Sequence, residues 1–224
     1  MAKRKVLFSW SGGKDSALAL GELMGDPAFE VAGLLTTVTE DYQRISMHGI
    51  RRALLDEQAA SLGLPLHVVL ISKDCDLKLY ERRMREVLDA ERAAGVEAVA
   101  IGDIFLEDLR RYREEKLAQA GMGAVFPLWK RDTKELAQEF LARGFKAVIT
   151  CVDTEKLDRS FAGRNYDAAF LADLPASVDP CGENGEFHSC VWDGPIFSRP
   201  LSFTRGEVVL RDGRFCFADL VPGA

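Results

Sequence analysis

The stretch "FSWSGGKDSALAL", residues 8–20, places small and polar residues between two apolar runs. The run that leads into it, "KVLFSW", suits a buried strand, and the run that leaves it, "KDSALALGELMG", suits an amphipathic helix. In doubly wound α/β sheets, ligands bind beyond the carboxyl ends of the strands, where loops lead into helix N-termini. The stretch therefore predicts a strand, a ligand-binding loop and a helix in direct succession.

The loop has the composition of a phosphate-binding site. Gly12 and Gly13 allow a tight turn in which main-chain N–H groups approach an anion, and the helix that follows adds the positive end of its dipole. Lys14 adds a mobile positive charge, and Ser11 and Ser16 add hydroxyl groups. A turn that serves only to cap the helix is the alternative, and the strand–loop–helix context favours the phosphate site.

Two common phosphate loops do not match this stretch. A Walker A loop needs a glycine five residues before Gly13 and Ser or Thr directly after Lys14, where this chain has Phe8 and Asp15. The G-x-G-x-x-G spacing of dinucleotide-binding loops is also absent. The order S-G-G-K-D-S after the first strand resembles instead the PP-loop of the ATP pyrophosphatase superfamily. Members of that superfamily split ATP between its α- and β-phosphates and transfer AMP to a substrate oxygen.

Short apolar runs alternate with amphipathic runs over the first part of the chain. Strand-like runs occupy residues 5–10, 30–38, 66–71, 98–104 and 124–129, and helix-like runs occupy 14–25, 49–63, 76–95, 106–121 and 133–144. Several helices end at a glycine suited to a left-handed cap: Gly63, Gly95, Gly121 and Gly144. This alternation predicts an α/β fold with a doubly wound parallel five-stranded sheet, and the PP-loop implies the adenine nucleotide alpha-hydrolase-like version of it.

The pattern changes after about residue 155. We expect a strand at 146–152, a helix at 157–174, a turn-rich segment, and a hairpin at 206–220 around Asp212-Gly213. These elements predict a smaller C-terminal α+β domain. The expected division is a PP-loop ATP-binding domain at residues 1–128 and a substrate or acceptor domain at 129–224.

Composition limits the classes of function. The 224 residues carry a formal net charge of −6, which argues against broad neutralisation of nucleic-acid phosphates. No apolar run reaches the length of about 18 residues that suggests a membrane span, and the N-terminus lacks a signal-peptide pattern. The cysteines are odd in number and form no C-x-x-C pair: Cys75, Cys151, Cys181, Cys190 and Cys216. We therefore expect a cytoplasmic protein with free thiols, and a homodimer stays open.

Five segments narrow the resemblance. "SWSGGKDS", "SMHGIR", "AIGDI", "PLW" and "GENGEFHSCVWDGP" occur in this order and resemble the diphthine–ammonia ligase family, in its prokaryotic branch, over essentially the whole chain. "GENGEFH" is the most discriminating segment, because the PP-loop fold does not require it. The resemblance implies an ATP-dependent, Mg²⁺-assisted ligase that adenylates a carboxylate, releases pyrophosphate and transfers ammonia. The implied acceptor is diphthine, a modified histidine of an elongation factor, if the source is archaeal or eukaryotic, and another carboxylate if it is bacterial.

The resemblance also implies site residues. The pyrophosphate loop would be Ser11, Gly12, Gly13, Lys14, Asp15 and Ser16, and the rest of the nucleotide site would be Thr36, Thr37, Gly102 and Asp103. Substrate contacts would come from His48, Arg110, Glu114, Glu183, Glu186 and His188, of which Arg110 and Glu114 resemble a family Arg/Glu pair one helical turn apart. Catalytic groups would be Lys14, Asp15, Glu186 and His188, and Asp15 or Asp103 would meet Mg²⁺. A plain structural role is the alternative for four of them: Asp15 as a first-turn helix acid, His48 as a surface cap, His188 as a packed histidine, and Glu186 as a partner of Arg159 or Arg164.

The sequence also bears on the nitrogen donor, and it leaves two functions other than the ligase open. The second residue is Ala2, not the cysteine that an N-terminal glutaminase exposes, so we expect free ammonia as the donor. A tRNA-modifying PP-loop enzyme is one rival, and Cys151 is the thiol that we would suspect for sulfur transfer. A non-catalytic ATP or AMP sensor of the same fold is the other.

Overall fold

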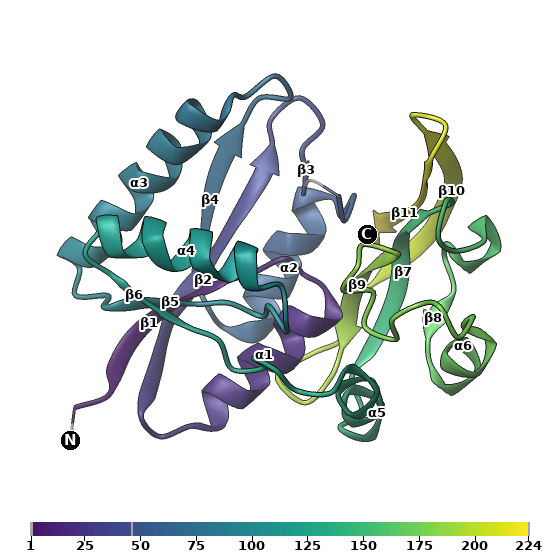
Figure 1. The fold of residues 1–224 in the computed structure, drawn as a ribbon, viewed down its shortest axis with the longest axis horizontal. Coiled ribbons are helices and arrows are strands. Elements are labelled where there is room, and N and C mark those ends of the chain that lie inside the picture. Colours follow the sequence, from purple (N-terminus) through teal and green to yellow (C-terminus); the bar gives the residue numbers. More distant parts are fainter. Residues whose placement is uncertain (1, 46, 224) are drawn as a thin grey trace.

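The computed structural model describes residues 2–45 and 47–223, and Figure 1 shows two sheets side by side. The first sheet contains β1 (Arg4–Ser9), β2 (Phe29–Thr39), β4 (Leu66–Ile71), β5 (Ala98–Ala100) and β6 (Gly123–Val125). Within the described residues these five strands are parallel, in the order β4-β2-β1-β5-β6, and β3 (Arg44–Ile45) pairs antiparallel with the end of β2. The predicted α/β fold with a five-stranded parallel sheet is confirmed.

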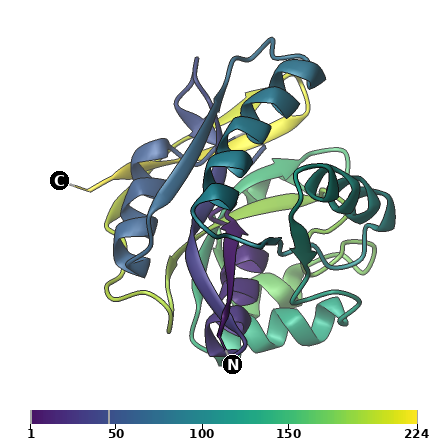
Figure 2. The same cartoon turned by 90° about the vertical axis from the view of Figure 1, so that its left-hand side faces the viewer.

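Helices cover both faces of this sheet (Figure 2). They are α1 (Lys14–Gly25), α2 (Arg52–Leu62), α3 (Leu77–Ala93) and α4 (Glu107–Gln119). Val6 and Phe8 of β1 join the core under α1 and α2, whereas Leu7 joins the core under α3 and α4. Because both faces of the strand are buried, its sequence is apolar without polar alternation.

The order of the strands places a ligand site at one edge of the sheet. The chain adds β2 and β4 on one side of β1, and later adds β5 and β6 on the other side. The direction therefore reverses between β1 and β5, and ligands of open α/β sheets bind at the carboxyl ends of the strands that flank such a reversal. The residues after β1 and after β5 meet at this point.

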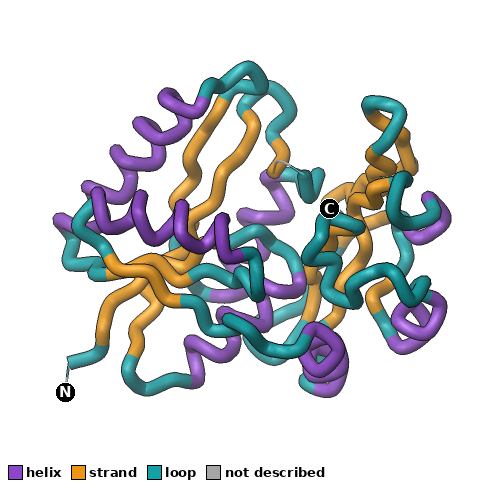
Figure 3. Tube along the Cα trace, in the orientation of Figure 1, coloured by secondary structure: helices purple, strands orange, loops and turns teal. Residues whose placement is uncertain are grey.

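The second sheet is antiparallel, and Figure 3 shows its strands grouped apart from those of the first sheet. It contains β7 (Lys146–Asp153), β8 (Asn165–Tyr166), β9 (Phe187–Asp193), β10 (Phe203–Arg211) and β11 (Phe215–Pro222). The order is β10-β11-β7-β8, and β9 also pairs with β7. The helices of this part are α5 (Thr133–Ala142) and α6 (Ala168–Asp173). The predicted hairpin at Asp212-Gly213 is confirmed, with both residues at positive φ.

One expected element of the second part is wrong. Residues 157–174 form a short 3-10 turn η1 (Arg159–Phe161), then β8, and only then α6. The helix cannot run through, because Gly163 has a φ of 79° and Asp167 caps a new helix with its side chain. The spacing of apolar residues suggested one helix, because Phe161 and Phe170 are both core residues although they belong to the separate elements η1 and α6.

The two sheets are joined by contacts between α2, the loop after β1, and β9. The chain crosses from the first sheet to the second between β6 and α5, and our predicted boundary after residue 128 falls in this connection and stays a proposal. Ser61 of α2 is hydrogen-bonded to Ser198 and Arg199 of the second part. In the ranges that the structure covers, no helix is long and apolar enough to cross a membrane.

Candidate active site

The loop between β1 and α1 needs both of its glycines. Gly12 has a φ of 74°, and a Cβ on it would lie 2.8 Å from Oε1 of Gln58. Gly13 has an ordinary φ of −92°, but a Cβ on it would lie 3.0 Å from Cε1 of His48 and 3.2 Å from the carbonyl oxygen of Ser189. The first glycine is therefore required by backbone conformation, and the second by the close approach of the second sheet.

Gln58 of α2 fastens this loop to β9. Its side chain is fully buried, its Oε1 accepts from Nε1 of Trp10 at 2.9 Å, and its Nε2 donates to the carbonyl oxygens of Gly12 at 3.1 Å and Val191 at 2.6 Å. The amide of Val191 also donates to the Gly12 oxygen at 2.9 Å. Sequence reasoning missed Gln58, and its position in an ordinary amphipathic helix carries no signal of this role.

Hydrogen-bond donors gather where α1 begins. Lys14, Asp15 and Ser16 form the first turn of α1, so their amides have no acceptor inside the helix. The amide of Lys14 donates to Oγ of Ser189 at 3.2 Å, and the hydroxyls of Ser11 and Ser16 lie 3.0 Å apart. This arrangement of amides and hydroxyls suits the oxygens of an anion such as phosphate.

The side chain of Lys14 is buried as a cation. Its Nζ lies 2.7 Å from the carboxylate of Asp15 and donates to the carbonyl oxygen of Cys181. Burial acts to lower the pKa of Lys14, but Asp15, Cys181 and Glu183 outweigh it and raise the pKa above its ordinary value of 10.5. A permanent positive charge therefore lies between the first turn of α1 and the second sheet.

Three carboxylates from separate segments lie near one another here. Asp15 of α1 and Glu183 before β9 act on the charge of Lys14, and Asp103 after β5 lies near both of these carboxylates. Burial, followed by the charge of Asp15, raises the pKa of Glu183 to about 7, and burial also raises the pKa of Asp103. Over the described residues, no group of three or more metal-ligating side chains is positioned to hold a metal ion.

Two neutral histidines lie against the loop. The rings of His48 and His188 have their centroids 4.5 Å apart, and Nδ1 of His48 lies 3.3 Å from the carbonyl oxygen of Ser189. Burial lowers the pKa of His48 to about 4, and burial together with His48 and Lys14 lowers the pKa of His188 well below its usual value. Both imidazoles are therefore uncharged at neutral pH, and their surroundings disfavour the protonated form. The segment 46–51 that contains His48 begins at Ser46, which lies outside the described residues.

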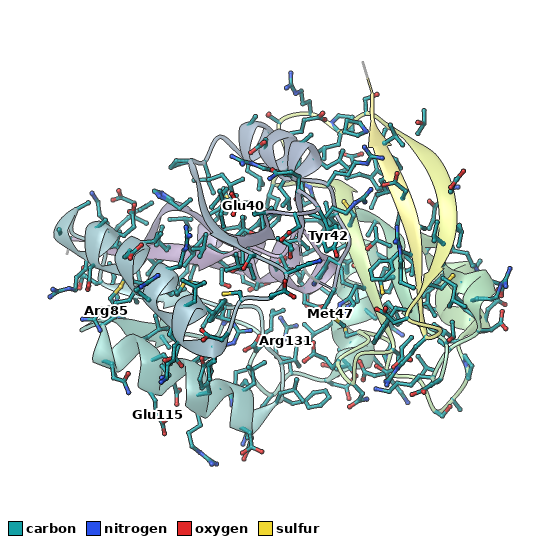
Figure 4. The ribbon with its side chains drawn as sticks, turned by 90° about the horizontal axis from the view of Figure 1, so that it is seen from above. Glu40, Tyr42, Met47, Arg85, Glu115 and Arg131 are labelled. Atoms are coloured by element: carbon teal, nitrogen blue, oxygen red, sulfur yellow. The ribbon has the colours of Figure 1, made fainter. Side chains whose placement is uncertain are left out.

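A cavity of about 860 Å³ opens on the other side of the loop, toward α3 and α4. Ser11, Thr36, Thr37 and His48 line it. Figure 4 shows two further residues of its lining, with Met47 between the two halves of the molecule and Arg85 out on α3.

Thr36 marks a polar position in this cavity. Its side chain is 3% exposed, and its Oγ1 has no hydrogen-bond partner among the described residues. A buried hydroxyl without a partner is unusual in proteins, so Thr36 marks a place where a bound molecule would supply one.

Arg110 and Glu114 lie apart from this cluster. Nε of Arg110 donates to Glu114 at 2.7 Å, and its guanidinium lies 4.7 Å from the ring centroid of Phe126 and 4.5 Å from that of Trp129. The contacts predicted between this pair and a substrate find no support in this arrangement. Arg113, which sequence reasoning passed over, lines the cavity instead.

Glu186 is turned into its own loop. Its carboxylate is buried and accepts from the amide of Asp179 at 3.1 Å and from the amide and Nδ2 of Asn184 at 3.0 and 3.1 Å. These bonds hold the turn that brings Glu183 to Lys14. A catalytic role for Glu186 therefore has no support in its contacts, and neither does the alternative of an arginine partner.

Comparison with known families agrees with this geometry. A family model of the diphthamide synthase N-terminal domain matches residues 4–123, and one of the C-terminal domain matches residues 132–214. The chain belongs to the diphthine–ammonia ligase family. The two matches of this family fall on the first sheet and on most of the second.

Curated members of the diphthine–ammonia ligase family are similar over most of this chain. The protein of Schizosaccharomyces pombe is 26% identical and aligns with 95% of this chain, which spans 38% of that protein's length. The Bos taurus and Homo sapiens proteins are 28% and 27% identical over 89% of this chain and 82% and 83% of their own. All three are named diphthine–ammonia ligase. A solved U34-tRNA thiolase, NcsA of Methanococcus maripaludis, is 17% identical, with a TM-score of 0.38 over 62% of this chain and 56% of its own.

Proposed function

We propose that this family member is an AMP-forming ligase that uses ATP, Mg²⁺ and free ammonia to convert the carboxylate of diphthine into an amide. Residues 1–128 would hold the nucleotide, and residues 129–224 would hold the acceptor. The observation that carries the proposal is the position of the loop at 11–16. Ser11 of the loop lines the cavity together with Thr36, and His188 and Glu183 of the second part lie near Lys14 of the same loop.

The first turn of α1 would receive the β- and γ-phosphates of ATP. The amides of Asp15 and Ser16 and the hydroxyl of Ser11 supply donors, and the positive end of the helix favours an anion there. The hydroxyl of Ser16 donates to the carbonyl oxygen of Gly13 at 2.9 Å. Thr36 and Thr37 would meet the base or ribose in the cavity. The buried Oγ1 of Thr36 would gain the partner that it lacks among the described residues.

The acidic residues fit a magnesium ion that is held largely by the nucleotide. Mg²⁺ is commonly bound through one or two carboxylates together with phosphate oxygens and water, so a full cage of protein ligands is not required. Oδ2 of Asp103 is buried and, among the described residues, has no hydrogen-bond partner. Asp103 and Asp15 would hold the ion, which would neutralise charge on the departing pyrophosphate.

The first chemical step is adenylation. A carboxylate oxygen of the acceptor attacks the α-phosphorus of ATP, and the bond from that phosphorus to the oxygen of the β-phosphate breaks. Pyrophosphate leaves with the bonding electrons, and its growing charge is stabilised by the loop amides and by the buried cation of Lys14.

The second step is amide formation. Ammonia attacks the acyl carbon of the adenylate, and AMP leaves with the electron pair of the carbon–oxygen bond. The nitrogen must then lose a proton. Glu183 lies near Lys14, and burial and Asp15 raise its pKa to about 7, so its carboxylate is the base that we assign to this proton. His188 stays neutral beside His48, and we assign it a contact with the acceptor.

Sulfur transfer is the less suitable function for this chain. Cys151 is buried in β7, and burial, with the neighbouring Cys216 and Asp153, raises its pKa to about 12. The reactive form of cysteine is the thiolate, which a thiol in this environment does not reach at neutral pH. The observations therefore favour the ligase.

The decisive experiment combines the purified protein with α-labelled ATP, ammonium chloride and an elongation factor that carries diphthine. We expect labelled AMP, pyrophosphate and the mass change of one carboxylic acid becoming an amide. When the acceptor carboxylate carries isotopically heavy oxygen, one heavy atom should appear in AMP. Formation of ADP, or AMP without label transfer from the carboxylate, would refute the mechanism. Glutamine in place of ammonium is the control for the nitrogen donor.

A further inference from the structure

Arg113 of α4 and Asp103 form a half-buried ion pair that leaves both side chains incompletely bonded. Nε of Arg113 lies 2.9 Å from Oδ2 of Asp103, and both atoms are shielded from solvent. Their geometry does not make a hydrogen bond, and neither atom has another partner among the described residues. Buried charged atoms are normally hydrogen-bonded, so this pair is arranged to gain further partners.

The position of the pair connects the cavity to the loop. Arg113 lines the cavity, and Asp103 directly follows Gly102. The backbone of Gly102 lies so close to α1 that a Cβ on it would be 3.2 Å from the carbonyl of Asp15 and from Cα of Ser16. The ion pair therefore lies between the cavity and the first turn of α1.

We propose that Arg113 binds the nucleotide at its α-phosphate, which is the phosphoryl group transferred with AMP, and that Asp103 holds the Arg113 side chain in position. The proposal rests on the proposed function, because it assumes that the cavity holds a nucleoside triphosphate. A guanidinium carries five N–H donors in a planar fork that matches phosphate oxygens, and the contact with Asp103 occupies only one side of it. A triphosphate with its divalent cation would give Arg113 its missing acceptors and give Asp103 a cation.

The other cations of the cavity are less suited to this task. Lys116 is paired with Glu81 at 2.7 Å, and Arg85 is paired with Asp89 at 2.8 Å. Lys78 and Arg82 also line the cavity, but both are exposed on α3. Arg113 is distinguished from them by its buried Nε, which has no hydrogen-bond partner among the described residues, and by its link to the segment that contacts α1.

Arg110 supplies a matched control from the same helix, one turn earlier. Its guanidinium lies over Phe126 and Trp129 and is bound to Glu114, outside the lining of the cavity. Arg110→Met and Arg113→Met therefore remove the same charge from the same helix. They differ in whether the lost group faces the proposed phosphate.

The test measures binding of two probes by calorimetry in the presence of Mg²⁺. One probe is α,β-methylene-ATP, which carries the phosphate chain but resists adenylyl transfer, and the other is adenosine. We expect Arg113→Met to weaken binding of the analogue by about 10-fold to 100-fold, the range for a charge-assisted hydrogen bond, and to change adenosine binding by less than about 2-fold. Arg110→Met should leave both affinities within about 2-fold of the wild type.

The ratio of the two affinities decides the proposal. The proposal is overturned if Arg113→Met leaves the ratio of the affinities for the analogue and for adenosine unchanged. This would happen if neither affinity fell, or if both fell by the same factor. If that variant does not fold, Arg113→Lys keeps the charge without the planar fork, and an unchanged ratio there would overturn it equally. A wild-type protein that binds the analogue but never forms AMP from ATP would contradict the proposed function and leave the Arg113 measurement standing.

Discussion

Glu183 and Glu186 belong to the same turn, and we expect their replacement by glutamine to change stability in opposite directions. The carboxyl of Glu183 is buried near Asp15 and Asp103, and these surroundings raise its pKa from 4.5 to about 7. The carboxylate of Glu186 accepts three hydrogen bonds from Asp179 and Asn184. The first charge opposes folding at neutral pH, whereas the second stabilises the turn.

The magnitude for Glu183 follows from proton linkage. The folded protein holds this proton more tightly than the unfolded chain, so the stability that Glu183 contributes is fully present below pH 4.5 and is lost as the pH rises through about 7. At about 1.4 kcal/mol for each pKa unit, the loss from this group is at most about 3.5 kcal/mol at pH 8. Glutamine mimics the protonated acid, so Glu183→Gln should raise the free energy of unfolding by about 1–3 kcal/mol at pH 8 and by little at pH 4.5.

Glu186→Gln should lower the free energy of unfolding by about 1–3 kcal/mol at both pH values. Glutamine has one oxygen where glutamate has two, so its NH₂ group then faces an N–H donor that needs an acceptor. Urea unfolding at the two pH values measures both variants, and an unchanged slope against urea concentration shows that the same surface is exposed. If the two variants shift the midpoint in the same direction, or if the gain from Glu183→Gln is equal at both pH values, the reasoning is wrong. We also expect Glu183→Gln to slow AMP formation, because destabilising charges at active sites are commonly retained for function.

Three further predictions concern the loop and its neighbours. Lys14→Met should lower the rate of pyrophosphate release by at least about 100-fold while the protein stays folded, because no other cation lies against Asp15 at the start of α1 among the described residues. Burial lowers the pKa of His48 to about 4, so this group by itself should cost up to about 3 kcal/mol of stability as the pH falls from 6.5 to 4, opposite in sign to Glu183. The stability of His48→Asn relative to the wild type should therefore rise over this range in urea unfolding. Gln58→Leu leaves the Trp10 donor without an acceptor and should cost about 2–4 kcal/mol, against less than about 0.5 for the exposed Gln138→Leu.

Much of the first sheet could be predicted from local sequence. The periodicity and the glycines placed α1 at 14–25 and β4 at 66–71 in agreement with the structure. All four predicted helix-ending glycines, at 63, 95, 121 and 144, have positive φ. These features depend on residues within one or two turns of each other, and short-range spacing records them directly.

The second part was less predictable. The apolar run at 146–152 correctly predicted a buried strand, β7. Its sequence does not indicate that the neighbouring strands β8, β9 and β11 run antiparallel to it. An apolar run reports burial and not the direction or identity of the neighbouring strand. The same ambiguity made residues 157–174 look like one helix, although they divide into η1, β8 and α6.

The candidate site shows the same division at the level of single residues. Gly12, Gly13 and Lys14 stood out because loop, charge and helix start adjoin in the sequence. Gln58 and Arg113 did not, since each is an ordinary polar residue of a helix until the fold places it. Glu183 and Glu186 were both predicted to contact the substrate, and which of the two lies near Lys14 depends on the conformation of the turn.

By itself the sequence determined the alternation of strands and helices and the phosphate-binding composition of residues 11–16, because both follow from the order of neighbouring residues. Only the tertiary structure decided that β9 lies against the loop, with Ser189 on the amide of Lys14 and His188 beside His48. These contacts join residues more than a hundred positions apart. Their formation depends on how two sheets pack through α2 and β9, and no local spacing encodes that packing.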